Sequence, residues 1–460
     1  MKQKIEFDEA LLKKYNISGP RYTSYPTAVQ FSDTFELAGY HQALSQSNTN
    51  QPLSLYFHIP FCDTVCFYCG CNKIATKDHT KSPPYLSALY QEIAMHASLT
   101  PTTRVVEQLH FGGGTPTFLN DAEMTDLMAN IREHFTLADD EVGEFSIEID
   151  PRKANGDTIR HLRSLGFNRL SVGVQDFYPD VQKAVNRIQS REETMAVIDA
   201  ARDCGFKSVS IDLIYGLPHQ TLETFSNTLD EVISISPDRL SVFNYAHMPH
   251  LFKPQRRINE SDLPSTAEKL KILQRSIEQL SDAGYAHIGI DHFAKPDDEL
   301  AIAQREGHLH RNFQGYSTHA ECDLIAMGVS GIGQVGDCFA QNVRTLDEYY
   351  AAIERKELPI FRGFMMTEDD HIRRHVIMEL MCHYTLDFGV VEQTFGLKFA
   401  EYFKSELEAL KPFEEDGLLV QEGPKVIVQP KGRLLIRNIA MVFDYYLNQG
   451  KSVNKFSKVI

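Results

Sequence analysis

The chain has 460 residues, of which 42% are hydrophobic and 23% are charged, as in globular proteins large enough for two or three domains. Its 46 basic and 62 acidic residues give a formal net charge of −16, which argues against nucleic acid as the main partner. The longest apolar runs fall far short of the ~20 residues of a membrane-spanning helix, and residues 1–14 contain no apolar signal segment. We therefore expect a cytoplasmic protein with no membrane or nucleic-acid partner.

The chain alternates between two kinds of segment from about residue 53 to residue 295. Short apolar, β-branched segments predict strands at residues 53–59, 106–112, 144–150, 169–175, 208–216 and 239–245. Longer segments with apolar residues at i, i+3 and i+4 predict helices at residues 83–99, 121–135, 157–166, 191–205, 222–236 and 266–284. This order predicts βα units and a parallel sheet, either doubly wound or as an incomplete barrel.

Polar or small residues stand at the predicted carboxyl end of all six strands. They are His58, Gly112 to Gly114, Glu148 with Asp150, Gln175 with Asp176, Asp212, and Asn244. Ligands of parallel α/β folds bind beyond these strand ends. We expect the six ends to form the floor of one site.

Two regions lie outside the alternating core. The first 50 residues contain the turn-rich, aromatic sequence GPRYTSYPTA at residues 19–28. After about residue 365, helices are predicted at residues 369–384, 388–396 and 398–417, followed by a hairpin at 418–430 and a helix at 431–447. Three helices and a hairpin suggest a winged-helix-like domain, and the acidic chain favours a packing role for it over DNA binding.

Four of the eight cysteines, Cys62, Cys66, Cys69 and Cys71, fall within ten residues, spaced C-x3-C-x2-C-x-C. Thiols this close in sequence cannot all point into one core. Structural zinc ordinarily takes its ligands from two separated pairs, which the chain lacks. An iron–sulfur cluster is the favoured interpretation, because Cys thiolate is its standard ligand. The other four cysteines are interpreted as small buried hydrophobic residues.

The spacing C-x3-C-x2-C supplies three sulfurs to a cubane and leaves one iron without a protein ligand. An open coordination position distinguishes a catalytic metal site from a closed structural one. Cys71 follows Cys69 on a tether too short to reach the fourth iron, so we do not expect it to be a ligand.

The motif C-x3-C-x-aromatic-C after a first strand, with Tyr68 as the aromatic residue, resembles that of the radical S-adenosylmethionine enzymes. The sequence GGGTPT at 112–117 resembles their glycine motif, in which a backbone without Cβ atoms approaches a ligand closely. The resemblance implies a [4Fe-4S] cluster whose open iron is chelated by the amino and carboxylate groups of S-adenosylmethionine.

Further motifs in order along the chain resemble those of oxygen-independent coproporphyrinogen III oxidases. These motifs are GPRYTSYPTA, YFHIPFC, SIEIDPR, RLSVGVQDF, IDLIYGLPHQT and RNFQGYST. The resemblance covers nearly the whole chain. It implies an α/β fold, namely an incomplete (β/α)6-type barrel, with a helical, winged-helix-like C-terminal domain and an N-terminal extension. The expected division is 1–50 for the extension over the active site, 51–360 for the catalytic domain and 361–460 for the C-terminal domain.

The activity that the resemblance implies belongs to haem biosynthesis. Two propionate side chains of coproporphyrinogen III become vinyl groups, giving protoporphyrinogen IX, and each loses a hydrogen atom, CO2 and one electron. The β-carbon hydrogen is too weakly acidic for a side-chain base, so a 5′-deoxyadenosyl radical is the expected agent. A flavodoxin or ferredoxin is the expected electron donor, and we expect a monomer.

Site residues follow from the same motifs. The expected cluster ligands are Cys62, Cys66 and Cys69, and the expected catalytic set adds Tyr56, Glu148 and Cys71. Positions matching those that hold a first S-adenosylmethionine are Tyr56, Gly112, Glu148 and Ile332. Positions matching those of a second molecule are Tyr68, Gly113, Gly114 or Thr115, Gln175, Arg187, Asp212 and Ala246. Each of these taken singly is as consistent with a structural salt bridge or cap.

The substrate bears four carboxylates, so cationic and tyrosyl groups are expected to meet it. Candidates are Arg21, Tyr22, residues 253–257 (KPQRR) and residues 308–312 (HLHRN), although such runs are more often solvated basic patches. Three alternatives stay open: a haem chaperone on the same scaffold, a related radical enzyme with another substrate, and a zinc-stabilised scaffold.

Overall fold

The structure is a computed structural model that describes residues 5–46, 50–449, 456 and 458. It divides into two compact units, both discontinuous in sequence. We call Phe31–Ser265 with Glu321–Met365 the sheet unit, and the described parts of Met1–Gln30, Thr266–Ala320 and Met366–Ile460 the helical unit. The three-part division at residues 50 and 360 stays a prediction, and its residues 1–4, 47–49, 450–455, 457 and 459–460 lie outside the described residues.

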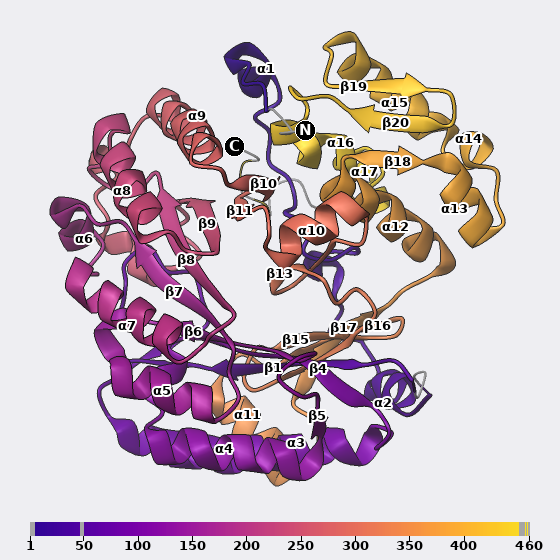
Figure 1. The fold of residues 1–460 in the computed structure, drawn as a ribbon. Coiled ribbons are helices and arrows are strands. Elements are labelled where there is room, and N and C mark those ends of the chain that lie inside the picture. The colour runs from indigo at the N-terminus through magenta and orange to yellow at the C-terminus, as the bar shows by residue number, and fades with distance from the viewer. Residues whose placement is uncertain (1–4, 47–49, 450–455, 457, 459–460) are drawn as a thin grey trace. The chain divides into compact units, whose positions relative to one another are not determined.

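All six predicted strands form in the sheet unit, and they lie side by side in the order β9-β8-β7-β6-β4-β1 (Figure 1). Their bounds are β1 (Leu53–Ile59), β4 (Val105–Gly113), β6 (Glu144–Ile149), β7 (Arg169–Gln175), β8 (Ser208–Tyr215) and β9 (Arg239–Asn244). Every neighbouring pair is parallel. The carboxyl ends of the strands therefore meet at one edge, as the sequence predicts.

The alternation of side chains along these strands explains the two faces of the sheet. In β6, Phe145, Ile147 and Ile149 are buried while Ser146 and Glu148 point the other way. In β8, Val209, Ile211 and Leu213 are buried and Asp212 takes the opposite face. One face of the sheet consequently packs against helices, and the other carries polar groups toward the strand ends.

The predicted helices of the sheet unit are confirmed as α3 (Ser82–Leu99), α4 (Asp121–His134), α5 (Gly156–Ser164), α7 (Arg191–Asp203) and α8 (Leu222–Ile235). Capping boxes start four of them, with Asn120, Asn155, Ser190 and Thr221 as the N-cap residues. Helices α3, α4, α5 and α7 lie along one side of the sheet (Figure 1). A further helix that the periodicity does not predict, α6 (Pro179–Ala184), follows β7.

The sheet continues past β1 with strands that have no βα pattern. Strand β14 (Asp323–Met327) pairs in parallel with β1, and β15 (Ile332–Val335), β16 (Cys338–Asn342) and β17 (Ile360–Met365) follow in antiparallel order. No pairing closes the described strands of this unit into a ring, so the predicted incomplete barrel is confirmed. The remaining elements of the unit are α2 (Leu37–Gln46), β2 (Phe61–Cys62), β3 (Ile74–Ala75), η2 (His79–Lys81), η3 (Pro116–Phe118), β5 (Thr136–Leu137), η4 (Pro151–Lys153), η5 (Lys253–Arg257), η6 (Glu260–Asp262) and α11 (Leu346–Glu354).

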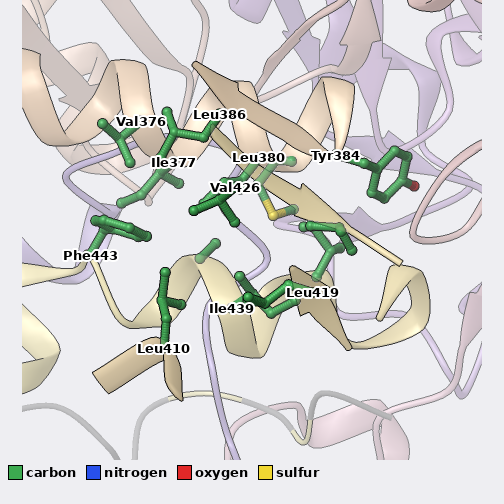
Figure 2. Packing of buried hydrophobic residues seen from close by; sticks show 14 of the residues in the cluster. Val376, Ile377, Leu380, Tyr384, Leu386, Leu410, Leu419, Val426, Ile439 and Phe443 are labelled. Atoms are coloured by element: carbon green, nitrogen blue, oxygen red, sulfur yellow. The ribbon is translucent and has the colours of Figure 1, made fainter. Parts of the chain in front are cut away.

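The C-terminal part of the helical unit has the predicted winged-helix-like content. It contains α12 (Glu368–His383), α13 (Phe388–Phe395) and the hairpin β19 (Leu419–Glu422) and β20 (Lys425–Val428), to which β18 (Thr385–Asp387) adds a third strand. Figure 2 shows its core, in which Val376 and Leu380 of α12 lie with Val426 of the hairpin and Ile439. The helical C-terminal domain is therefore confirmed.

Two predicted helices of this part are each broken. The segment 398–417 forms α14 (Phe399–Tyr402) and α15 (Lys404–Glu415), because Phe403 leaves helical geometry and packs, fully buried, against Phe399 and Phe443. The segment 431–447 forms η7 (Arg433–Leu435), α16 (Ile436–Met441) and α17 (Tyr445–Asn448). Asp444 interrupts the predicted single helix, because its backbone is extended and its side chain caps the start of α17.

The helical unit also contains helices α1 (Glu9–Lys14), α9 (Thr266–Asp282) and α10 (Glu299–Glu306), the short η1 (Ala28–Gln30), and two hairpins. The hairpins are β10 (Ala286–Gly289) with β11 (His292–Ala294), and β12 (His310–Asn312) with β13 (Gly315–Ser317). No helix in the described part of the chain is long and apolar enough to cross a bilayer.

Candidate active site

The loop that carries the clustered cysteines leaves the carboxyl end of β1 and is closed at its base. Strands β2 and β3 pair in parallel, and the Ile74 amide donates to the Pro60 carbonyl at 2.7 Å. The Phe67 amide donates to the Val185 carbonyl at 2.9 Å, which ties the loop to the segment after α6. We call residues 62–73 the cysteine loop. Its backbone is held from two sides, so its thiols have defined positions.

A cavity of about 260 Å3 lies at the carboxyl ends of the parallel strands, and the cysteine loop forms one wall of it. All four clustered thiols line it. So do these predicted site residues: Tyr68, Gly113, Gly114, Thr115, Glu148, Gln175, Arg187 and Asp212. Four of the six strand ends singled out in the sequence, those of β4, β6, β7 and β8, therefore face one cavity together with the cysteines, whereas His58 and Asn244 are not among the residues that line it.

Four predicted site residues, Tyr56, Gly112, Ala246 and Ile332, are not among those that line the cavity, although Gly112 adjoins Glu148, which does. Tyr56 of β1 lies across from His110 in the parallel ladder. A Cβ atom on Gly112 would come within 2.9 Å of Glu148 Oε1. The Ala246 carbonyl accepts from Gln255, which also donates to the Tyr68 carbonyl at 2.9 Å. Ile332 starts β15, two strands from β1.

Several groups interact directly with the cysteine sulfurs. Thr115 Oγ1 donates to Cys62 Sγ at 3.5 Å, yet burial raises the pKa of Cys62 to about 11. A hydrogen bond from the Cys71 thiol lowers the pKa of Cys69 to about 6 and raises the pKa of Cys71 well above its ordinary value. Lys73 Nζ donates to the Cys69 carbonyl at 3.0 Å. Cys71 thus stabilises the thiolate form of Cys69.

The glycine triplet after β4 leaves room that any side chain would fill. Gly113 has a φ of +112°, and a Cβ there would lie 2.6 Å from the His58 ring. A Cβ on Gly114 would lie 2.6 Å from the carbonyl oxygen of Phe61, the residue before Cys62. The strand end therefore approaches the cysteine loop as bare backbone, in agreement with the glycine motif.

Glu148 is held by groups on the neighbouring strand. Its Oε2 accepts from the Gly113 amide at 3.2 Å, and His110 Nε2 lies 3.5 Å from its Oε1. Burial would by itself raise the pKa of the Glu148 carboxyl, but the interactions with His110 and Gly113 lower it below the ordinary value. His110 in turn contacts Ser146 Oγ at 2.5 Å through Nδ1 and stacks on Tyr56 with 5.7 Å between ring centroids. Glu148 is therefore an oriented carboxylate.

A group of three charged side chains surrounds Cys66. Arg187 Nη1 reaches Cys66 Sγ at 3.7 Å and Arg152 Nη2 reaches it at 3.5 Å. Asp150 bridges the two guanidinium groups, at 3.3 Å from Arg187 and 2.6 Å from Arg152. Two guanidinium groups therefore donate toward the sulfur of Cys66.

The sequence did not single out three residues that contact this site, namely Lys73, His110 and Arg152. A signal exists for His110, because β4 places it opposite Tyr56 and Ser146 in the ladder. For Arg152 no local pattern exists, since it acts on Cys66, 86 positions away.

The donor set fits an iron–sulfur cluster and a ligand beside it. Three thiols from one short loop, with cationic and hydroxyl donors on the sulfurs, match the thiolate coordination that such clusters need. The bare glycine backbone, the Glu148 carboxylate and Arg187 offer hydrogen bonds to an amino acid and a ribose. The Nε of Arg187 is buried and has no hydrogen-bond partner in the described part of the chain, which leaves one donor for a ligand.

The candidate substrate contacts fall in both units. Residues 253–257 form η5, where Arg257 packs over the Phe67 ring of the cysteine loop at 5.2 Å. In the helical unit, Arg21 pairs with Asp291 and the Tyr22 hydroxyl donates to Asp444. Residues 308–312 include the buried Arg311 of β12. This segment contacts the cysteine loop through Arg257 and the buried Gln255, while the side chains of Lys253, Arg256 and Arg257 are exposed, as in a solvated basic patch.

Comparison with known protein families agrees with this geometry. The family description "Radical SAM superfamily" matches residues 56–232, and the description "HemN C-terminal domain" matches residues 366–435. The open parallel sheet with its cysteine loop therefore defines a radical S-adenosylmethionine enzyme.

Curated proteins resemble the chain over its whole length. The oxygen-independent coproporphyrinogen III oxidase of Salmonella typhimurium is 54% identical over 100% of this chain and 99% of its own. The same enzyme of Escherichia coli is 52% identical with equal coverage. A solved structure titled as coproporphyrinogen III oxidase (HemN) from Escherichia coli, a radical SAM enzyme, has a TM-score of 0.92 at 51% identity and covers 96% of this chain and 100% of its own. This chain belongs to the oxygen-independent coproporphyrinogen III oxidase family.

Proposed function

We propose that this chain converts two propionate side chains of coproporphyrinogen III into vinyl groups without oxygen, giving protoporphyrinogen IX in haem biosynthesis. The observation that carries the proposal is the meeting of Cys62, Cys66 and Cys69 with the strand-end residues around one cavity, in a chain with whole-length identity to this family. The enzyme is an oxidoreductase.

Cys62, Cys66 and Cys69 are the residues that would hold a [4Fe-4S] cluster. Together, the bound cluster and S-adenosylmethionine supply a carbon radical strong enough to remove the propionate β-hydrogen, which no side-chain base could do at neutral pH. The hydrogen-bonding groups on the sulfurs, Thr115, Arg152 and Arg187, hold the thiolates in place and stabilise their charge.

Tyr56, Gly112, Glu148 and Ile332 are proposed to hold the first S-adenosylmethionine. The ionised and oriented carboxylate of Glu148 can accept hydrogen bonds, and the glycine backbone beside it lets a ligand approach closely. Tyr56 contacts Nδ1 of His58 at 3.1 Å, and the other ring nitrogen of His58 contacts the Asn72 carbonyl at 2.8 Å. Tyr56 and the end of the cysteine loop are therefore fixed through one histidine.

A second S-adenosylmethionine is proposed on Tyr68, Gly113, Gly114 or Thr115, Gln175, Arg187, Asp212 and Ala246. Asp212 supports this assignment, because it faces the cavity and accepts from Ser171 Oγ at 2.8 Å. Apolar residues on the same wall, Ile149, Ile214 and Phe243, exclude water from the place where a radical has to survive. Cys71 is proposed to tune Cys69 through its hydrogen bond rather than to bind iron.

We propose a monomer in the cytoplasm that receives electrons from a flavodoxin- or ferredoxin-type protein. All eight cysteines are free thiols, as is usual in a reducing compartment. The formal charge of −16 opposes binding to nucleic acid or to anionic lipid.

The test is an anaerobic assay of the reconstituted full-length protein with a strong reductant, S-adenosylmethionine and coproporphyrinogen III. Formation of 5′-deoxyadenosine together with the divinyl product supports the proposal. Tight haem binding without turnover would favour the chaperone alternative, and bound zinc without labile sulfide would favour the scaffold.

A further inference from the structure

Arg311 is a buried arginine with an unused donor. Only 4% of the residue is exposed, and its Nη1 has no hydrogen-bond partner among the described residues. Its Nε makes one long contact, 3.4 Å to the Arg21 carbonyl, and its guanidinium lies 4.6 Å from the centre of the Tyr316 ring. Strand pairing fixes this geometry, because Arg311 of β12 faces Tyr316 of β13. None of these partners carries a negative charge.

In another buried arginine of the same unit, carboxylates compensate the positive charge. Arg373 of α12 is 8% exposed and pairs with two carboxylates, Asp369 at 2.8 Å and Glu406 at 2.9 Å. Arg311 forms no ion pair with any residue in the described ranges. A buried charge without a counter-charge costs several kcal/mol, so Arg311 is a feature that folding alone does not favour.

Further positive charge gathers at the same place. Arg21 pairs with Asp291 at 2.6 Å, and the Arg21 side chain is 34% exposed, so solvent reaches its guanidinium. Arg437 donates to the carbonyls of Gly19 and Pro20. Burial and the nearby Arg21 and Arg311 lower the pKa of Arg437 to about 9.

The histidine beside Asp291 in sequence adds no positive charge of its own. Burial and then Arg311 lower the pKa of His292 to about 3, and Asp291 and Arg21 also act on its ring. Asp291 is paired with Arg21, whereas Arg311 has no ion pair among the described residues, so one guanidinium of this group lacks a negative partner.

We propose that Arg311 and Arg21 bind a carboxylate, and that it is a propionate carboxylate of the porphyrinogen substrate, an inference that rests on the proposed function. The planar guanidinium fork matches a carboxylate in two parallel hydrogen bonds. The substrate brings four such groups. Arg437 holds residues 19 and 20 and thereby positions Arg21, while Arg311 and Arg21 contact the ligand.

The test measures binding of coproporphyrin III, the stable tetracarboxylate, to the reconstituted full-length protein by fluorescence titration. Loss of one charge-assisted contact is expected to weaken binding about 10- to 100-fold in Arg311→Gln and in Arg21→Gln. Arg305→Gln, which changes an exposed arginine of the same unit, is the control and should bind like the wild type. The tetramethyl ester of the same porphyrin should bind the wild type no better than Arg311→Gln binds the acid.

Unchanged affinity in both arginine variants would overturn the inference, and so would displacement of the porphyrin by acetate or phosphate at similar concentration, which would identify a free small anion as the ligand. If Arg311→Gln does not fold, the half-exposed Arg21 gives the same test. Failure of the proposed function has a different signature, because the wild type would then form no divinyl product at all.

Discussion

The guanidinium of Arg187 reaches the thiol of Cys66 with 3.7 Å between Nη1 and Sγ, across 121 positions of sequence. The same side chain donates to the Gly173 carbonyl at the end of β7 at 2.6 Å and pairs with Asp150. Arg187 therefore connects the cysteine loop to two strand ends of the sheet.

Replacing Arg187 with Gln should make the protein lose its iron–sulfur cluster faster. Groups that hydrogen-bond metal ligands typically contribute about 10- to 100-fold to metal affinity or activity. We expect Arg187→Gln to lose iron to a chelator about tenfold faster than the wild type. Arg191→Gln removes a half-exposed ion pair with Glu231 and serves as the control. Equal iron loss in both variants would show that Arg187 does not support Cys66.

Cys66 and Cys71 should differ in their response to replacement by serine. Cys66→Ser removes one of three proposed ligands, so nearly all iron, labile sulfide and cleavage of S-adenosylmethionine should be lost. Cys71→Ser should keep near-normal iron, because Cys71 is exposed and is not in the proposed ligand set. Cys204→Ser is the control on a distant helix end. Collapse of the cluster in Cys71→Ser would place that residue among the ligands.

A methyl group on Gly114 should disturb the cysteine loop. It would lie 2.6 Å from the Phe61 carbonyl oxygen and 2.8 Å from Pro60, both of them backbone, immediately before Cys62. We expect Gly114→Ala to assemble much less cluster, as measured by the visible absorption and iron content of the anaerobic protein. In Gly156→Ala, the nearest neighbour is the movable Arg160 side chain at 3.3 Å, so that variant should load normally. Normal loading in Gly114→Ala would show that the loop can shift.

The stability of the metal-free protein should depend on Asp212. Burial raises the pKa of Asp212 to about 6, against the hydrogen bonds from Ser171 and Ser241. A carboxyl whose pKa is raised in the folded state binds its proton more tightly there, so stability is lost as the pH rises through 6. Relative to Asp212→Asn, the wild type should lose about 1 kcal/mol of unfolding free energy between about pH 5 and about pH 7.5. A constant difference in urea titrations across this range would contradict the shift.

Glu92 should be the most costly single residue to remove from the sheet unit. This fully buried carboxylate accepts from the Tyr349 hydroxyl at 2.5 Å, from Asn342 at 2.6 Å and from the Gly328 amide at 2.8 Å. Glu92→Leu leaves these donors unsatisfied, and we expect a loss of about 3 to 5 kcal/mol in the free energy of unfolding. Gln91→Leu, on the exposed face of the same helix, should change it by less than about 0.5 kcal/mol. Comparable losses of unfolding free energy in both variants would show that the hydrogen bonds to Glu92 do not stabilise α3 against the sheet unit.

Most of the sheet could be predicted because its signals are local. The strands β1 and β7 have the bounds that their apolar segments indicate, and capping residues start the helices between them. The strands β14 to β17 could not be predicted in this way. Strand β14 pairs with β1, which lies 270 positions earlier, and β15 to β17 extend the sheet from β14; no period along the chain records that attachment.

In the candidate site, too, some residues could be predicted from local motifs and others could not. Its thiols and glycines lie in short motifs, so their chemistry was evident from spacing. The groups that act on them, such as His110 on Glu148 and Arg152 on Cys66, come from other strands and turns. Their roles depend on register and on which strands are neighbours.

The sequence by itself determined the βα order, the cysteine loop and the family, because side-chain period and ligand spacing are properties of neighbouring residues. Only the tertiary structure decided that Arg311 has no counter-charge while Arg373 has two. Whether a buried charge is compensated depends on residues brought together from distant segments, and a linear list of charges does not contain that information.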